Sequence, residues 1–322
     1  MTDATPPLVN LLSIAEVERD TGLGKDTLRV WERRYGFPTP ARDGQGQRLY
    51  TQADVDRLRQ IASLLRAGHR PGRVVTLDDA GREALLRPDA AMSTVSTQAA
   101  AGPDAAKAPA QSVAVATALA TLVRRDGLGL RRQLQQGLTR LGLATFVTDL
   151  MAPLATAVGT AWMRGELRVA DEHLFTEVAH SVLRQGLLTV PEPIPGAAPR
   201  VLLTTLPGEP HGLGLLMAEA MCALEGAWCV NLGPQTPIDE IVAAAGWHHA
   251  QIVGLSATGS LPVRWLRQGL TQLRQRLSPG TVLWLGGSAA AGLRGPAGVV
   301  RISDLRLIAP ALAACPPESP AG

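Results

Sequence analysis

The chain has 322 residues, of which 46% are hydrophobic and 3% aromatic, and its formal net charge at pH 7 is +3. This length predicts two or three domains, and the apolar content is sufficient for packed cores. There is no run of eighteen apolar residues and no basic-then-apolar signal pattern, so we expect a cytoplasmic protein with no membrane association.

The excess positive charge lies in the first quarter of the chain. Residues 1–75 contain twelve Lys or Arg and nine Asp or Glu, a net charge of +3, whereas the remainder contains nineteen of each. A basic module of this kind is typical of nucleic-acid binding.

Within this first segment the pattern predicts a helix-turn-helix followed by a hairpin. Helices are expected at 14–20, after a capping-box pattern, and at 25–34, with a tight glycine turn between them. A glycine-rich hairpin, or wing, is expected at 44–50, and a third helix with apolar periodicity at 52–65.

The run at 27–36 and the later Arg48-Leu49-Tyr50 closely resemble the MerR family of winged-helix regulators, over about residues 12–73. The resemblance implies that the helix at 25–34 enters the major groove of promoter DNA and that the wing contacts phosphates. The alternative is a solvated charged helix, and the wing favours the regulator. The candidate DNA-binding residues are Lys25, Thr27, Arg29, Arg33, Arg34, Tyr35, Arg48 and Tyr50.

A segment of biased composition separates this predicted DNA-binding domain (1–75) from the rest. Residues 87–111 contain nine Ala and three Pro with almost no large apolar side chain. Such a composition cannot build a core, so we expect a flexible linker over 76–111.

The next segment has apolar residues at helical spacing and predicts a four-helix bundle over 112–190. The expected helices are 113–125, 129–142, 144–164 and 170–188.

Strand and helix patterns then alternate over 199–314, which predicts a Rossmann-like, doubly wound parallel sheet. Residues 315–322 are expected to be a disordered tail. The whole chain is therefore predicted to be multidomain: a winged helix-turn-helix head, a four-helix bundle and an α/β domain.

Three predicted strand ends in this last domain carry polar or glycine motifs. The first has Glu209-x-His211 followed by Gly214, the second Ser256-x-Thr258, and the third Gly286-Gly287. Imidazole is a good ligand for transition metals, and glycines let a bound group approach the backbone closely. The carboxyl ends of such strands are where open α/β sheets bind ligands.

These motifs, in this order, resemble the cobalamin-binding Rossmann-like module. The resemblance implies that His211 ligates cobalt from below and displaces the dimethylbenzimidazole tail, which enters the sheet between the other two motifs. Thr258 departs from the pattern, where Leu or Val is commoner. The candidate cofactor-binding residues here are Glu209, His211, Gly214, Ser256, Thr258, Gly286 and Gly287.

In the predicted bundle, Trp162 is followed by nine residues and then by Glu172-His173. Placed before a cobalamin module, this combination resembles the bundle of the CarH/LitR photoreceptor regulators. The resemblance implies that all three residues cover the upper face of adenosylcobalamin. Light-sensing members carry a histidine after the Trp, where this chain has Met163; a stable two-histidine adduct is not expected there, although His180 is a conceivable substitute.

We therefore expect a non-enzymatic, cobalamin-dependent transcriptional regulator, most consistent with a light-responsive repressor that forms dimers or tetramers. One alternative is a regulator of the same architecture that senses haem or another tetrapyrrole, since His211 could ligate iron. The other is a corrinoid-dependent enzyme subunit, which the winged helix disfavours.

Overall fold

The computed structural model describes residues 11–66, 69, 71–86, 107–193, 199–259, 261–292 and 296–315. The chain divides into two compact units. Unit 1 comprises Met1–Ala101 and Thr160–Val169, and unit 2 comprises Gly102–Gly159 and Ala170–Gly322. Most of the predicted linker, and the predicted tail after Cys315, lie outside the described residues.

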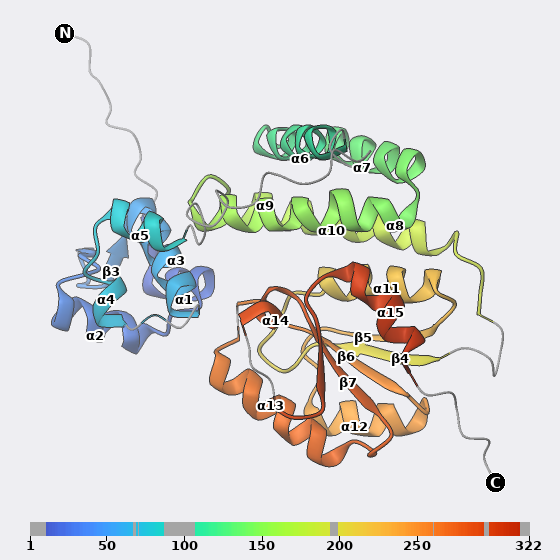
Figure 1. Ribbon diagram of the computed structural model, residues 1–322. Coiled ribbons are helices and arrows are strands. Elements are labelled where there is room, and N and C mark those ends of the chain that lie inside the picture. Colours follow the sequence, from blue (N-terminus) through green and yellow to red (C-terminus); the bar gives the residue numbers. More distant parts are fainter. Residues whose placement is uncertain are drawn as a thin grey trace, which may run out of the picture. The chain divides into compact units, whose positions relative to one another are not determined.

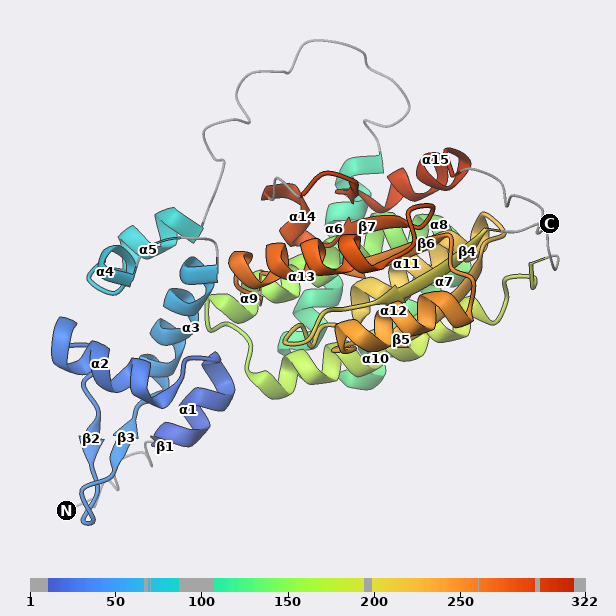
Figure 2. The same ribbon diagram turned by 90° about the horizontal axis from the view of Figure 1, so that it is seen from below.

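Unit 1 is a small helical domain with a three-stranded antiparallel sheet in the order β1-β3-β2. The elements of unit 1 are β1 (Leu12–Ser13), α1 (Ile14–Thr21), α2 (Lys25–Tyr35), β2 (Ala41–Arg42), β3 (Arg48–Tyr50), α3 (Gln52–Arg66), α4 (Pro71–Val74) and α5 (Asp79–Leu86). The hairpin of β2 and β3 projects beyond the helices (Figure 2).

The ends of the first two helices follow the sequence signals closely. Ser13 and Glu16 form the capping box at the start of α1, with the backbone N–H of Ser13 donating to the Glu16 carboxylate over 2.7 Å. α1 ends at Gly22 and α2 at Gly36, and both glycines have positive φ, 71° and 69°. The predicted helix-turn-helix is therefore present.

A buried ion pair ties α3 to α1. Arg59 is 2% exposed, and its guanidinium donates two 2.6 Å hydrogen bonds to the Asp20 carboxylate and one of 2.7 Å to Asp56. This bidentate geometry compensates a charge that would otherwise be costly to bury. The surrounding core includes Val17, Leu28 and Trp31.

Two features of unit 1 differ from the sequence prediction. Residues 79–86 lie in the predicted linker but form α5, because the composition there still allows a helix with Arg82 fully buried. Residues 160–169 were assigned to the bundle but belong to unit 1, where the Trp162 ring lies 5.4 Å from the Arg59 guanidinium.

The helical part of unit 2 matches the predicted bundle closely. Its elements are α6 (Lys107–Val123), α7 (Gly127–Leu141), α8 (Leu143–Thr145), the π-helical turn η2 (Phe146–Met151), α9 (Ala152–Met163), whose last residues are in unit 1, and α10 (Val169–Leu187). Asp126 caps α7 through a 2.7 Å bond from the backbone N–H of Gly129. α6 begins inside the predicted linker.

One continuous helical stretch, Leu143–Met163, is long and apolar enough to cross a membrane by length and composition alone. The core helix of a soluble protein passes the same test, so the stretch is weak evidence for a membrane span. In unit 2 its first part packs on α6, α7 and α11.

The rest of unit 2 is a five-stranded parallel sheet in the order β5-β4-β6-β7-β8. Helices cover both faces, with α11 and α15 on one and α12 and α13 on the other (Figure 1). The elements are β4 (Arg200–Thr204), α11 (Leu213–Leu224), β5 (Trp228–Gly233), α12 (Ile238–Trp247), β6 (Ile252–Ser256), α13 (Val263–Arg276), β7 (Val282–Gly286), α14 (Ser288–Gly292), β8 (Val299–Ile302), η3 (Leu305–Leu307) and α15 (Ile308–Ala313).

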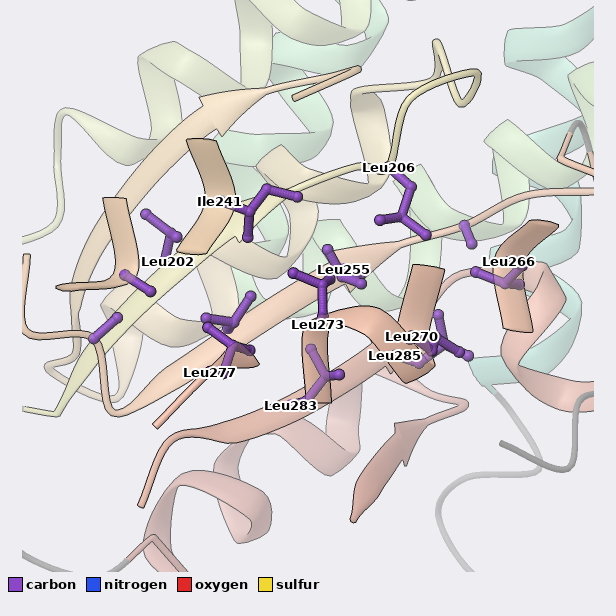
Figure 3. Close-up of a cluster of buried hydrophobic side chains, with 14 of the residues drawn as sticks. Leu202, Leu206, Ile241, Leu255, Leu266, Leu270, Leu273, Leu277, Leu283 and Leu285 are labelled. Atoms are coloured by element: carbon purple, nitrogen blue, oxygen red, sulfur yellow. The ribbon is translucent and has the colours of Figure 1, made fainter. Parts of the chain in front are cut away.

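Leucine side chains fill the space between this sheet and the α12–α13 layer. Leu202, Leu255 and Leu283, on β4, β6 and β7, belong to one buried cluster with Ile241 of α12 and with leucines of α13 (Figure 3). Alternating residues of each buried strand supply this face, as a doubly wound sheet requires. The predicted Rossmann-like architecture is confirmed.

The strand order places a topological switch point at β4, because the chain moves to β5 on one side and then returns to β6 on the other. Open α/β sheets bind ligands at the carboxyl ends of the strands beside such a point. The loops after β4, β6 and β7 are those that carry the three sequence motifs.

Candidate functional site

The loop after β4 brings Glu209 and His211 into contact. Nδ1 of His211 lies 2.6 Å from Oε1 of Glu209. An ionised carboxylate can only accept, so Nδ1 carries the proton and Nε2 has the lone pair that a metal ion needs. The Glu209 side chain is 1% exposed and that of His211 48%, so a buried carboxylate orients an accessible imidazole.

Glu209 is also held by the loop after β6. Its Oε2 accepts 2.7 Å from the backbone N–H of Thr258 and 2.9 Å from the Thr258 hydroxyl. Burial by itself raises the pKa of Glu209, but the hydrogen bonds from His211 and Thr258 outweigh it, and the pKa is lowered. The carboxylate therefore stays ionised and keeps accepting from His211.

The Thr258 hydroxyl has a role that sequence reasoning missed. At this departure from the family pattern, the oxygen lies 3.2 Å from Nδ1 of His211 as well as within hydrogen-bond distance of Glu209. Thr258 is thus placed with the Glu209–His211 pair, in addition to its predicted place near the cofactor tail. The sequence did contain a clue to this role, because Thr258 places a hydroxyl at a motif position that is usually apolar.

The glycines of the three motifs are explained by close backbone approach. A Cβ on Gly214, in the first turn of α11, would lie 2.5 Å from Oγ of Ser256. A Cβ on Gly287, whose φ is +85°, would lie 2.3 Å from the Ala257 carbonyl oxygen. Gly286 pairs with Ser256 across β7 and β6, so the three motifs meet at one edge of the sheet.

The residues expected above the cofactor lie in different units. Glu172 and His173 are on α10 in unit 2, with Glu172 accepting from the Thr176 hydroxyl over 2.8 Å and the His173 side chain 73% exposed. In unit 1, Trp162 stacks near Arg59, and the Met163 sulfur accepts a 2.8 Å hydrogen bond from Ser63.

On the candidate DNA-binding surface, α2 presents Arg29, Arg33 and Arg34 as exposed side chains. Within the described residues, Arg29 pairs at 3.0 Å with Asp26, whose side chain is 94% exposed. Such a surface pair is weak and easily exchanged for a phosphate or a base. Lys25 pairs with Glu18 at 3.4 Å, and Thr27 and Tyr35 are partly exposed on the same helix.

The two predicted wing residues lie in different environments. Tyr50 was expected to contact DNA, but it is 0% exposed because its side chain belongs to the core of unit 1 that includes Val17 and Leu58, so this expectation was wrong. Arg48 donates 2.6 Å to Glu32 of α2, and this hydrogen bond raises the pKa of Arg48. Glu32, which also pairs with Arg42 at 3.8 Å, therefore fixes the wing to α2.

Comparison with known families assigns all three regions. Residues 12–80 match the MerR HTH family regulatory protein model, residues 199–296 match a B12 binding domain, and residues 116–185 match a second B12 binding domain model. The HTH-type transcriptional repressor CarH of Myxococcus xanthus is 30% identical over 269 residues, covering 84% of this chain and 86% of CarH.

The chain belongs to the CarH-like MerR regulators. A second relative in the family, the repressor CarA of Myxococcus xanthus, is 29% identical and covers 76% of both chains. This CarH-like protein is a cobalamin-binding, DNA-binding transcriptional regulator and not an enzyme. The B12-binding matches give no support to haem as the cofactor.

Solved structures similar to this CarH-like chain include the monomethylamine corrinoid protein of Methanosarcina barkeri. It has a TM-score of 0.48 and 14% identity, covering 61% of this chain and 94% of that one. A cobalamin-binding protein from Desulfitobacterium hafniense has a TM-score of 0.30 and 20% identity, covering 54% of this chain and 83% of that one.

Proposed function

We propose that this protein is a light-responsive repressor whose binding to promoter DNA is controlled by adenosylcobalamin. The observation that carries the proposal is the Glu209–His211 pair at the carboxyl edge of the sheet, in the same chain as a winged helix. The names of CarH and CarA, both repressors, support the direction of control.

The donor set at the sheet edge fits a corrinoid. An accessible imidazole, oriented by an ionised carboxylate, is a suitable axial ligand for cobalt. We assign His211 as the ligand, with Glu209 and Thr258 orienting it. Gly214, Ser256, Gly286 and Gly287 are assigned to the tail and ring, and Trp162, Glu172 and His173 to the upper group, on the family resemblance.

When bound, adenosylcobalamin supplies a cobalt–carbon bond that light can break. The chain's own contribution is to hold and sense it. Glu209 keeps the proton on Nδ1 of His211, so the imidazole presents Nε2 as the ligand atom. Trp162, Glu172 and His173 would pack against the upper group, and without that packing partner they would move to a second discrete arrangement, as packed interiors do.

We further propose that residues 1–75 form the DNA-binding domain and 199–314 the cobalamin domain. The proposed linker, 76–111, includes α5 near its start and the first residues of α6 at its end. The proposed bundle, 112–190, includes residues 160–169, which group with unit 1. Residues Lys25, Thr27, Arg29, Arg33, Arg34, Tyr35 and Arg48 would contact DNA. A cytoplasmic location and self-association to a dimer or tetramer complete the proposal, since paired half-sites favour a symmetric assembly.

The direct test is a mobility-shift titration of promoter DNA with the full chain, without cofactor, with adenosylcobalamin in darkness, and after illumination. We expect tight binding only in the dark, cofactor-loaded sample. The His211→Ala variant is the matched control for cobalamin loading. If DNA affinity changes when the cofactor is added but does not change on illumination, the signal is the availability of the cofactor and not light.

A further inference from the structure

A half-buried histidine of the bundle faces the loop that carries His211. His180 lies on α10, and its Cε1 atom is 4.0 Å from the position that a Cβ on Gly212 would take. Gly212 directly follows His211 in the chain. The packing of α10 in unit 2 thus places a second imidazole beside the backbone of the cobalt-binding loop.

The Nε2 atom of His180 is buried and has no hydrogen-bond partner within the described part of the chain. Burial lowers the pKa of His180, as does Arg184 to a smaller degree, while Glu177 acts in the opposite direction. Buried polar atoms in folded proteins nearly always have partners, so this nitrogen calls for a partner that the described part of the chain does not supply. A ligand at this loop would provide one once the half-buried ring turns toward it.

The location of His180 also decides which part of a corrinoid it can reach. The ring lies at the backbone of residue 212, which is the base of the His211 side chain, whereas a ligand on the opposite face of the cobalt must lie beyond the tip of that side chain. His180 is therefore not a substitute for the histidine that Met163 replaces. It is on the same side as the lower ligand.

We propose that His180 is a further cofactor-binding residue, whose imidazole hydrogen-bonds an amide side chain at the edge of the corrin ring on the His211 side. Primary amides both donate and accept, so either tautomer of a neutral imidazole finds a partner there. The proposal rests on cobalamin binding at His211 and adds a contact from the bundle. It would let α10 respond directly to loading of the sheet domain.

The test compares His180→Leu and His180→Gln with the parent, and uses His248→Ala, at the exposed end of α12, as the control. Affinity for hydroxocobalamin is measured by calorimetry, and the visible spectrum reports the cobalt ligands. We expect His180→Leu to weaken binding about tenfold with an unchanged spectrum, and His180→Gln, which keeps a polar group, to lose less.

Cobalamin derivatives with one peripheral amide hydrolysed to a carboxylate identify the partner. One derivative should bind the parent more weakly than intact cobalamin does. The same derivative and intact cobalamin should bind His180→Leu equally, because the two changes remove the same interaction. Unchanged affinity of a folded His180→Leu protein would overturn the proposal, as would loss of the histidine-bound spectrum. A parent chain that binds no cobalamin at all would instead refute the function on which the proposal rests.

Discussion

At the scale of single residues, the lower ligand is the sharpest prediction. We expect His211→Ala to lose the histidine-bound cobalamin spectrum, because the imidazole oriented by Glu209 is the ligand that we propose. The measurement is the visible spectrum of the loaded variant beside that of the parent, with His248→Ala as a surface control.

His180 makes a second control necessary for this experiment, because it lies near the same loop. The double variant His211→Ala, His180→Leu should have the same cobalt spectrum as His211→Ala alone. If His211→Ala retains both the parent spectrum and the parent affinity, His211 is not the ligand.

Thr258 carries the second residue-scale prediction. Thr258→Val keeps the shape and the backbone N–H that donates to Glu209 but removes the hydroxyl shared by Glu209 and His211. Loss of one hydrogen bond to a charged group should weaken cobalamin binding about tenfold while the histidine-bound spectrum remains. Calorimetric titration with hydroxocobalamin measures this.

The matched control for Thr258→Val is Thr139→Val on α7, where an exposed hydroxyl donates to the Gln135 carbonyl of the same helix. Equal affinities for the two variants would show that the Thr258 hydroxyl is dispensable. If Thr258→Val loses the histidine-bound spectrum, the hydroxyl is needed for ligation by His211 and not only for orienting it.

At the scale of elements, α2 and the wing should contribute differently to DNA binding. Arg29 is exposed on α2 with only a weak surface partner, so Arg29→Ala should weaken binding and relax base preference. Arg48→Ala should weaken all sequences about equally and reduce the salt slope by about one. Titrations of matched and scrambled promoter DNA at several salt concentrations separate the two.

The Arg48–Glu32 bond allows a further distinction. If Arg48 acts only by fixing the wing to α2, Glu32→Gln should weaken DNA binding as much as Arg48→Ala does. If Arg48 itself contacts a phosphate, Glu32→Gln releases it and affinity does not fall. Arg132→Ala, on the exposed face of α7, controls for the loss of one positive charge.

The elements themselves could largely be predicted from the sequence, because strong local patterns decide them. The helices expected at 25–34 and 52–65 are α2 and α3, each within one residue of those bounds, and the capping box marked the start of α1. The sequence did not predict which way individual side chains point or which residues they contact. A three-residue strand does not show which face is buried, so Tyr50 was misassigned.

The candidate site was predictable as a set of motifs but not as a network. Glu209 and Thr258 are 49 positions apart, and only the parallel pairing of β4 with β6 brings their loops together. The same holds for His180 and Gly212, which meet because α10 packs within unit 2. Local sequence patterns contain no information about such long-range hydrogen bonds and contacts.

At the scale of the whole molecule, a chain of two compact units can connect cofactor state to DNA binding through assembly. We predict that adenosylcobalamin in darkness favours a larger oligomer and that green light breaks it down. The physical reason is that the upper group fills space against the bundle, and its loss forces a second packing arrangement. Linked DNA-binding heads then gain or lose affinity for paired half-sites through multivalency.

Size-exclusion chromatography of the loaded protein, in darkness and after illumination, tests this prediction. The parent should elute earlier in the dark, and the change should be absent from His211→Ala if ligation by His211 is needed for loading. A visible spectrum of each fraction must show that cobalamin is bound and has been photolysed. Given that evidence, an unchanged elution volume would exclude light-driven disassembly. Cobalamin binding at His211 would be unaffected by that result, because the visible spectrum tests it separately.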